Sequence, residues 1–263
     1  MHNPKKFKIV SSKRTRYILP NILTLGGVCL GISSIKFSLD GNFSLAVNFI
    51  LLAAILDALD GRIARLIKGT SEFGKELDSL TDFVSFGIAP AFILYFWELN
   101  KYGKIGWAIT LVYSICCVIR LARFNLTKID SSEEWKQNYF EGIPSPIGGI
   151  LILLPLIYEL SDLEKIFNFK QFTPYLTIII SLLLISKFPT FSFKKISIPP
   201  KLTILILFAV GTSFVLLMFF TFETLLLFGV GYIITVPIAY FTYLQKNKKK
   251  KNNTSEEDHE DIL

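Results

Sequence analysis

Residues 57–82 read DALDGRIARLIKGTSEFGKELDSLTD and contain four aspartates where two long apolar runs meet. At about 100° of helix rotation per residue, Asp57 and Asp60 share one face of a helix. Asp78 and Asp82 are four residues apart and share one face of the next helix. If these two helices form a hairpin, the four carboxylates converge at membrane depth. The stretch therefore predicts two neighbouring helices organised around carboxylates.

Carboxylates at such a depth need a counter-charge. An unpaired carboxylate in hydrocarbon costs several kcal/mol, and like charges held close together repel further. A divalent cation held by carboxylate oxygens removes both costs, and hard oxygen ligands suit Mg²⁺ or Mn²⁺. We therefore predict metal ligation by Asp57, Asp60, Asp78 and Asp82.

Small residues accompany the aspartates. Gly61 directly follows the second aspartate, and Gly74 stands four residues before the third. A glycine inside a helix costs about 1 kcal/mol relative to alanine, so we expect a bulky ligand to approach the backbone there. Ala64 shares the face of Gly61, and Arg65 offers a planar fork of donors to a phosphate.

The spacing of these residues resembles the signature of the CDP-alcohol phosphatidyltransferase family. That signature reads D-x2-D-G-x2-A-R-x8-G-x3-D-x3-D, and residues 57–82 match every fixed position. From the residues alone, a helix hairpin with acidic caps at the membrane surface is the alternative. The resemblance implies transfer of a phosphatidyl group from CDP-diacylglycerol to a hydroxylated acceptor, with release of CMP. It also implies two divalent cations, a homodimer, and Asp82 as the base towards the acceptor hydroxyl.

Apolar runs dominate the rest of the chain. Of the 263 residues, 51% are hydrophobic, and eight runs of about 20 residues carry almost no charge between their ends. Only helices or closed barrels satisfy the backbone within a bilayer, and continuous runs of this length indicate helices. We therefore expect an all-α integral membrane protein, a bundle of about eight transmembrane helices. The runs lie near residues 18–39, 44–66, 79–97, 105–124, 146–160, 173–188, 201–221 and 224–244.

The basic residues indicate the orientation. If the eight runs cross in turn, all but five of the 28 lysines and arginines fall on the side that holds both termini and the aspartates. The positive-inside rule assigns that side to the cytoplasm. We expect a multi-pass protein of the cell (inner, cytoplasmic) membrane with its site facing the cytoplasm. The net charge of +7 then reflects topology and anionic headgroups rather than nucleic acid. The exceptions are Lys36, Lys101, Lys104, Lys165 and Lys170.

Two charged ends enclose one expected domain. Residues 1–17 form a basic juxtamembrane segment, residues 18–244 the transmembrane domain, and residues 245–263 a charged tail that we expect to be disordered. The two histidines, His2 and His259, lie in these ends. Their position excludes a histidine base, nucleophile or zinc ligand within the membrane.

Three further stretches resemble the phosphatidylserine synthase branch of the family. Pro-Asn with a following Leu-Thr resembles the opening of these enzymes and implies that Asn21 and Thr24 border the nucleotide, together with Gly61, Ala64, Arg65 and Gly74. RLARFN at 120–125 and FEGIPSP at 140–146 resemble two stretches typical of the same branch. The resemblance implies that the residues contacting the serine acceptor are Arg120, Arg123, Asn125 and Ser145.

The residues themselves also allow structural roles without catalysis, other acceptors and another class of protein. Arginines at an inner helix end usually reach to headgroups or fix topology, and the glycines at 26, 27 and 31 suit close helix packing in lipid. Glycerol 3-phosphate, inositol and choline each offer a hydroxyl, so only the resemblance favours L-serine. A cation-binding transporter is the alternative from another class. Transporters usually show internal repeats and midplane sites, whereas Asp57 lies near the inner end of its run.

Overall fold

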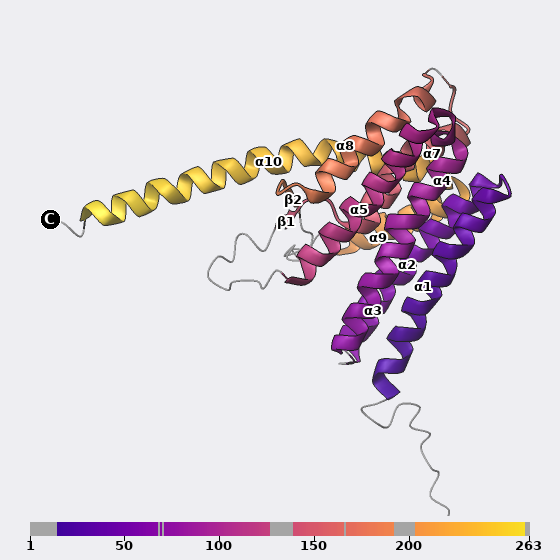
Figure 1. Ribbon diagram of the computed structural model, residues 1–263. Helices are drawn as coiled ribbons and strands as arrows, with labels where there is room; N and C mark the ends of the chain where they lie inside the picture. The colour runs from indigo at the N-terminus through magenta and orange to yellow at the C-terminus, as the bar shows by residue number, and fades with distance from the viewer. Residues whose placement is uncertain are drawn as a thin grey trace, which may run out of the picture. The chain divides into compact units, whose positions relative to one another are not determined.

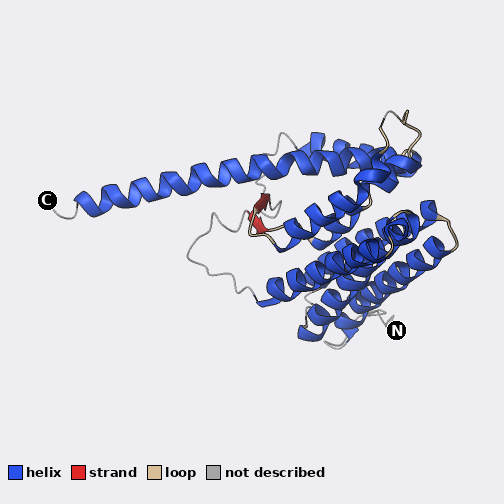
Figure 2. Ribbon diagram, turned by 45° about the horizontal axis from the view of Figure 1, so that its top comes forward, coloured by secondary structure: helices blue, strands red, loops and turns tan. Residues whose placement is uncertain are grey.

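The computed structural model describes residues 15–67, 69, 71–126, 139–165, 167–191 and 203–260. These residues are largely helical, with one short two-stranded sheet among them (Figure 1; Figure 2). The chain forms two compact units, Met1–Leu121 and Ala122–Leu263. The expectation of an all-α architecture is confirmed for the described part of the chain.

The first unit is a bundle of long helices. Its elements are α1 (Thr15–Leu39), α2 (Phe43–Leu66), α3 (Glu72–Asp82), η1 (Phe83–Ile88), α4 (Ala89–Trp97), η2 (Leu99–Tyr102) and α5 (Lys104–Leu126), which ends in the second unit. The element η1 is a π-helix and η2 is a 3-10 helix. α1 packs along α2 and also contacts α3, η1 and α4 (Figure 1). The helices that carry the aspartates therefore share α1 as a neighbour.

Polar caps set where the aspartate-bearing helices begin. Asn42 precedes α2, and its Oδ1 accepts a hydrogen bond from the Leu45 amide at 3.3 Å. Ser71 precedes α3, and its Oγ accepts from the Gly74 amide at 3.0 Å. Such caps satisfy amides that have no partner within the helix. They fix the first residues of α2 and α3, and with them the position of each aspartate along its helix.

Glycines allow α1 to approach its neighbours closely. A Cβ atom added at Gly31 would lie 3.0 Å from Cα of Ser85, and one added at Gly27 would lie 3.1 Å from Cγ2 of Thr81. In lipid, helix association depends on such close packing because no hydrophobic force draws helices together. These contacts agree with the packing interpretation of the glycines near the start of the chain.

The second unit combines shorter helices with the sheet. Its elements are β1 (Tyr139–Glu141), α6 (Ser145–Ile152), α7 (Leu154–Leu160), η4 (Phe169–Phe172), α8 (Thr173–Ile185), β2 (Pro189–Phe191), α9 (Thr203–Phe219) and α10 (Thr221–Glu260). β1 and β2 are antiparallel, with Tyr139 opposite Phe191. α10 contacts α6, α7, α9 and β2, so this long helix joins the parts of the unit.

A glycine locks the segment between β1 and α6 onto the end of α8. Gly142 has a φ of +74°, and its amide donates to the Phe188 carbonyl at 2.8 Å. The hydroxyl of Thr190 donates to the Gly142 carbonyl at 2.7 Å. A Cβ atom at position 142 would lie 2.8 Å from the Leu184 carbonyl oxygen and 2.9 Å from that of Ser186. Both the φ and the crowding therefore require glycine here.

Five helical segments are long and apolar enough to cross a membrane: Ile18–Leu39, Phe43–Leu66, Glu72–Trp97, Lys104–Leu126 and Thr221–Gln245. The expectation of a membrane protein with several apolar helices is therefore confirmed. Two other apolar runs form the shorter helices Phe169–Ile185 and Thr203–Phe219. The run at 146–160 forms two helices that meet at Leu153, two residues before Pro155. The count of eight spans stays a prediction.

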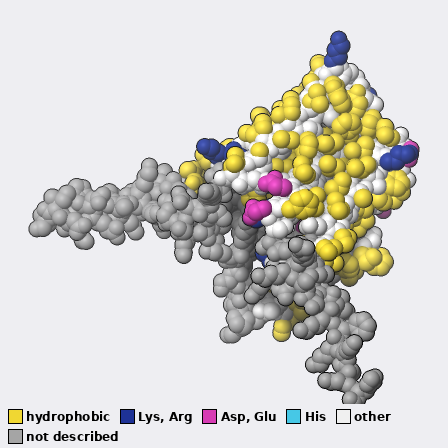
Figure 3. Space-filling view, turned by 60° about the horizontal axis from the view of Figure 1, so that its bottom comes forward, with side chains coloured by type: hydrophobic (Ala, Val, Ile, Leu, Met, Phe, Trp, Pro, Cys, Tyr) yellow, Lys and Arg dark blue, Asp and Glu magenta, His cyan; other side chains and the backbone are white. Residues whose placement is uncertain are grey.

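The apolar surface is large. α9 buries none of its residues, and its exposed side chains include Leu207, Phe208 and Phe214. Figure 3 shows a face on which hydrophobic side chains predominate and charged ones are few. A soluble protein rarely exposes so much contiguous apolar area, so lipid contact accounts for it.

The ends differ in part from the expectation. Residues 1–14 of the basic segment lie outside the described residues, and its last three residues begin α1. The tail was expected to be disordered from residue 245, but α10 continues as a helix to Glu260. Lysine and glutamate have high helix propensity, and extending an existing helix avoids the unfavourable nucleation step. The domain boundaries themselves stay predictions.

Candidate active site

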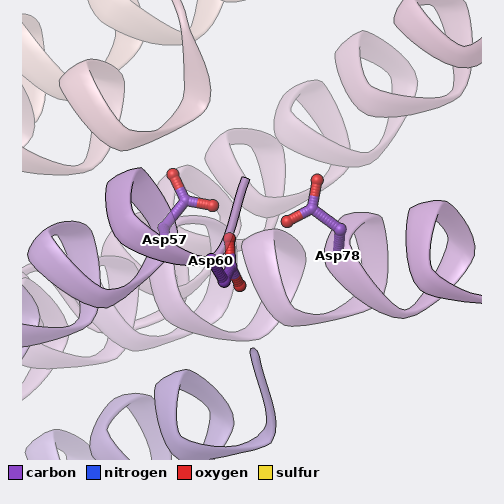
Figure 4. A group of neighbouring side chains, drawn as sticks. All are labelled: Asp57, Asp60 and Asp78. Carbon is purple, nitrogen blue, oxygen red and sulfur yellow. The ribbon is translucent and has the colours of Figure 1, made fainter. Parts of the chain in front are cut away.

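Three aspartates from two helices form a compact cluster. Asp57 and Asp60 come from α2 and Asp78 comes from α3, as Figure 4 shows. One carboxylate oxygen of each lies within 4.8 Å of the others. The convergence expected from their spacing in the sequence is therefore present in the structure. We call these three residues the aspartate cluster.

The donor set of the aspartate cluster suits a hard divalent cation. Mg²⁺ binds oxygen at about 2.1 Å, so oxygens on opposite sides of one ion are about 4.2 Å apart. A spread of 4.8 Å between the carboxylate oxygens is within a small side-chain adjustment of that value. Carboxylate oxygens are also the ligands that Mg²⁺ and Mn²⁺ prefer. The residues present therefore fit such an ion.

Asp82 ends α3 beside the aspartate cluster. Its carboxyl group lies close enough to that of Asp57 for a hydrogen bond when one of them carries a proton. The Oδ1 atom of Asp82 is buried and has no hydrogen-bond partner. A buried acceptor of this kind normally has a partner in a native structure. This oxygen can therefore accept a hydrogen bond or bind a cation.

Thr24 connects α1 to the aspartate cluster. Its hydroxyl donates to Oδ2 of Asp60 at 2.6 Å, and both residues are buried. Asn21 lies one helical turn earlier, and its Oδ1 would be 3.3 Å from a Cβ atom at Gly74. Both residues of the Pro-Asn-x-x-Thr stretch therefore border the aspartate-bearing helices. Their contact with a nucleotide stays a prediction.

The glycines of the signature differ in their surroundings. A Cβ atom at Gly61 would meet only the guanidinium of Arg65, at 3.7 Å from Nη1. A Cβ atom at Gly74 would lie 3.1 Å from the capping Oγ of Ser71. Gly61 therefore leaves open space next to an exposed arginine, with the half-buried Ala64 nearby on the same helix. At Gly74, the contact with the capping hydroxyl of Ser71 gives a structural reason for glycine in addition to ligand approach, and the sequence pattern did not predict that contact.

The two arginines of the RLARFN stretch have different environments. Arg120 is 8% exposed and lies close enough to Asp82 to interact with it electrostatically. Arg123 donates from Nη1 to the Ile185 carbonyl at 2.7 Å and from Nη2 to the Ser186 carbonyl at 3.2 Å. A cation suits these carbonyls because they end α8, at the negative end of the helix dipole. Within the first unit, the structure thus places Arg120 beside Asp82. The predicted contact of Arg123 with the acceptor stays a prediction.

The remaining residues expected at the acceptor lie in the second unit. Asn125 is exposed near the end of α5, and Ser145 is fully buried at the start of α6. Ser145 follows the segment that Gly142 locks to the end of α8. Their predicted contact with the acceptor stays untested.

The family model of the CDP-alcohol phosphatidyltransferases matches residues 17–186, and so includes the cluster, Asp82 and both arginines. This chain belongs to that family. The resemblance inferred from residues 57–82 is therefore confirmed. The chain carries these aspartates on two consecutive helices, and a threonine of α1 donates a hydrogen bond to one of them.

Several relatives of this chain share one activity name. The chain is 36% identical over 184 residues to the CDP-diacylglycerol–serine O-phosphatidyltransferase of Mycobacterium tuberculosis, covering 70% of this chain and 64% of the relative. It is 35% identical over 205 residues to the protein of the same name from Helicobacter pylori, covering 76% and 82%. The match to the Bacillus subtilis protein of that name is 37% over 142 residues, covering 54% and 77%. The chain thus spans less than two thirds of the mycobacterial relative.

Two hydroxyls on α5 were not predicted from the sequence. Tyr113 is fully buried and its hydroxyl donates to the Phe86 carbonyl at 2.9 Å. The hydroxyl of Ser114 lies 3.3 Å from the Gly87 carbonyl and 3.1 Å from the Thr110 carbonyl of its own helix. The available signal was a pair of polar side chains inside an apolar run, since buried hydroxyls need partners. The Phe86 and Gly87 carbonyls both belong to η1, the π-helix that directly follows Asp82.

Proposed function

We propose that this phosphatidyltransferase transfers a phosphatidyl group from CDP-diacylglycerol to the hydroxyl of L-serine, giving phosphatidylserine and CMP. The observation that carries the proposal is Asp82, whose Oδ1 is buried without a partner beside both Asp57 and the buried Arg120. Serine presents a hydroxyl and a carboxylate on one small molecule. The carboxylate of Asp82 can accept a proton from that hydroxyl, and the neighbouring guanidinium of Arg120 can bind the serine carboxylate. The activity name of the relatives supports the same acceptor.

The divalent cations belong to the same proposal. The aspartate cluster, with Asp82, would hold two ions of Mn²⁺ or Mg²⁺. When bound, such ions supply charge neutralisation for the pyrophosphate and for the charge that develops as its bond breaks. The hydroxyl of Thr24 fixes the carboxylate of Asp60 in a defined rotamer, because it donates to Oδ2 at 2.6 Å. A fixed ligand costs less ordering when the cation binds.

We assign CDP-diacylglycerol to the side of the cluster formed by α1, α2 and the start of α3. The open backbone at Gly61 lets a bulky nucleotide approach, and the exposed guanidinium of Arg65 can donate two parallel hydrogen bonds to a phosphate. The acyl chains remain in the bilayer against the apolar surface. The residues in this assignment are Asn21, Thr24, Gly61, Ala64, Arg65 and Gly74.

Asp82 takes the role of general base. Its carboxylate accepts the proton of the serine hydroxyl as the serine oxygen bonds to the phosphorus of the phosphatidyl group. The bond from that phosphorus to the bridging oxygen breaks, and CMP leaves with the electron pair. A charged guanidinium at Arg120 binds the serine carboxylate and orients the hydroxyl towards the base. Asn125 and Ser145 are proposed to complete the acceptor side, whereas Arg123 holds the end of α8.

The proposal includes the topology. We infer about eight crossings with both termini and the site on the cytoplasmic face of the cell membrane. Eight crossings in turn would put most lysines and arginines on the side of the termini, and basic residues favour the cytoplasmic side. Serine and CMP are water-soluble, so a site near that face exchanges both with the cytosol. The domain within residues 18–244 and the homodimer implied by the family resemblance belong to the same set of proposals.

An acceptor panel tests the proposed function. The purified full chain is reconstituted with CDP-diacylglycerol and Mn²⁺, and is offered L-serine, glycerol 3-phosphate, inositol or choline in turn. Lipid products are separated by chromatography and CMP is measured independently. We expect phosphatidylserine and an equal amount of CMP with serine alone, and neither from Asp78→Asn. A chain that ignores serine and consumes glycerol 3-phosphate would contradict the acceptor assignment.

A further inference from the structure

The π-helix η1 sets the direction in which Asp82 points. The amide of Ala89 donates to the carbonyl of Val84, five residues earlier, whereas an α-helix pairs residues four apart. One extra residue in such a turn rotates the preceding helix by about 100° relative to the following one. α3, which ends with Asp82, is therefore turned about its axis relative to α4.

This rotation lets two different faces point into the bundle. On α4, Ala89, Ala91 and Leu94 are fully buried. On α3, Asp78 lies in the aspartate cluster and Asp82 lies beside Asp57. If η1 relaxed to an ordinary α-helix while α4 kept its packing, α3 would turn by about 100° and carry its aspartates away from α2. The π-helix is therefore a requirement for the position of Asp82.

Two hydroxyls of α5 hold one side of η1. The hydroxyl of the fully buried Tyr113 donates to the Phe86 carbonyl at 2.9 Å. The hydroxyl of Ser114 shares its single proton between the Gly87 carbonyl at 3.3 Å and the Thr110 carbonyl of its own helix at 3.1 Å, so it contributes less than Tyr113. Carbonyls within a π-helix are less regularly paired than those in an α-helix, and a carbonyl without a donor is costly in a membrane. Gly87 permits the approach, because a Cβ atom there would lie 3.1 Å from Sγ of Cys117 on α5.

α1 holds the other side of η1. The hydroxyl of Ser85 donates to the Gly27 carbonyl at 3.1 Å, and both the oxygen and Cα of Ser85 come close to where a Cβ atom of Gly31 would be. The π-helix is thus fixed between α1 and α5. The substitution Tyr113→Phe removes one of these contacts without changing the packed shape, because phenylalanine retains the ring.

We propose that Tyr113, assisted by Ser114, is a positioning residue that keeps η1 in its π-helical form and so holds the carboxyl group of Asp82 against Asp57. Neither hydroxyl touches a reacting group. Their effect on turnover rests on the proposed function, in which Asp82 is the base. Their effect on the position of Asp82 does not depend on the acceptor.

The first measurement is the kinetics of Tyr113→Phe and Ser114→Ala. We expect Tyr113→Phe to lower kcat by about 10- to 100-fold, because displacing a reacting group by about 1 Å can cost about 100-fold. The KM values for serine and CDP-diacylglycerol should change less than about two-fold, and Ser114→Ala should lower kcat as well, but by a smaller factor.

Two matched controls remove a comparable hydroxyl elsewhere. Tyr158→Phe loses a bond to the Glu164 carbonyl, and Ser181→Ala loses one within α8. Both controls should retain wild-type kcat.

The second measurement reports the position of residue 82 without any turnover. In an Asp57→Cys/Asp82→Cys variant, dibromobimane becomes fluorescent when it bridges the two thiols. Single-cysteine variants give the background from Cys29, Cys116 and Cys117. We expect adding Tyr113→Phe to reduce the bridging rate several-fold, and adding Tyr158→Phe to leave it unchanged. Thermal unfolding of each variant gives its folded fraction at the assay temperature, to which the rates are normalised.

The two measurements test the positioning role of Tyr113 separately from the proposed transfer to serine. An unchanged bridging rate in the Tyr113→Phe background would overturn the positioning role, whatever the acceptor. A wild-type kcat for Tyr113→Phe would overturn its role in catalysis. A wild-type chain that makes no phosphatidylserine, yet loses bridging with Tyr113→Phe, would support the positioning role and reject the serine proposal alone.

Discussion

At the scale of single residues, the candidate site consists of carboxylates that repel one another unless something neutralises them. Thr24 gives Asp60 one hydrogen bond, but the aspartate cluster still gathers three carboxylates within 4.8 Å. Replacing one carboxylate by the isosteric amide keeps the shape and removes a charged ligand. The effect of such a change therefore reports on the cation rather than on packing.

We expect Asp57→Asn, Asp60→Asn and Asp78→Asn each to weaken Mn²⁺ binding by at least about ten-fold, since one lost carboxylate contact corresponds to more than about 1.4 kcal/mol. Binding is measured by the loss of the free Mn²⁺ signal in electron paramagnetic resonance on the purified chain. EDTA should abolish transfer by the wild type, and added Mn²⁺ or Mg²⁺ should restore it. The control is Asp40→Asn, because Asp40 is exposed and precedes α2 at the end of that helix opposite to Asp57. Wild-type Mn²⁺ affinity in all three variants would contradict the metal assignment.

Arg120 and Arg123 should separate kinetically. Arg120→Lys loses the planar fork, and about 1.5–3 kcal/mol of charge-assisted bonding corresponds to roughly a 10- to 150-fold rise in serine KM. The KM for CDP-diacylglycerol should stay close to that of the wild type. Arg123→Lys should instead lower thermal stability, because it loses two bonds to the carbonyls that end α8. A raised serine KM for Arg123→Lys with unchanged stability would reverse these roles.

The sequence predicted the residues of the aspartate cluster because their spacing on two helices fixes which faces they occupy. It did not distinguish the role of Arg120 from that of Arg123, because a spacing of three residues places both arginines on the same face of a helix. What distinguishes them is the position of the Ile185 and Ser186 carbonyls, about sixty residues further along the chain. Local spacing carries no information on such distant partners.

At the scale of elements, the apolar runs predicted which segments are helical, but not where several of these helices end or where their turns are irregular. The run at 79–97 was read as one helix, but it contains η1, whose residues FVSFGI show no pattern that separates a π-turn from an α-turn. The sequence pattern likewise predicts one continuous helix over 146–160, whereas the structure has two helices that meet at Leu153, near Pro155. Such features depend on packing against neighbouring helices, which a hydropathy pattern does not contain.

The turn at Gly142 allows a test at this scale. Gly142→Ala should destabilise the chain by about 1–2 kcal/mol for the positive φ, and by more for the clash with the Leu184 carbonyl. Gly41→Ala is the matched control, because its φ is +76° and nothing lies within 4 Å of its Cβ position. Thermal unfolding in detergent should show a larger loss for the Gly142 variant. Equal losses would mean that the segment can move away from α8.

At the scale of the whole molecule, five apolar segments support a membrane protein, and the direction in which it is inserted can be measured. Single cysteines are placed at Lys75 and at Asp40, which are both exposed and lie at opposite ends of the inferred crossings. In intact cells, a membrane-impermeant maleimide should label position 40 but not position 75, and lysis should expose position 75. Asp162→Cys should label like position 40. The opposite pattern would place the site on the outer face.

Thr24 stands 36 residues before Asp60 and leaves the ribosome first. α1 and α2 therefore reach the membrane with a hydroxyl already available for the carboxylate of Asp60, before α3 has been synthesised. Asp57 has no such early partner among the contacts described above, and its neighbours Asp78 and Asp82 arrive only with α3. One of the four aspartates therefore has its hydrogen-bond partner before α3 is made, and the complete group of carboxylates forms only when the third helix inserts.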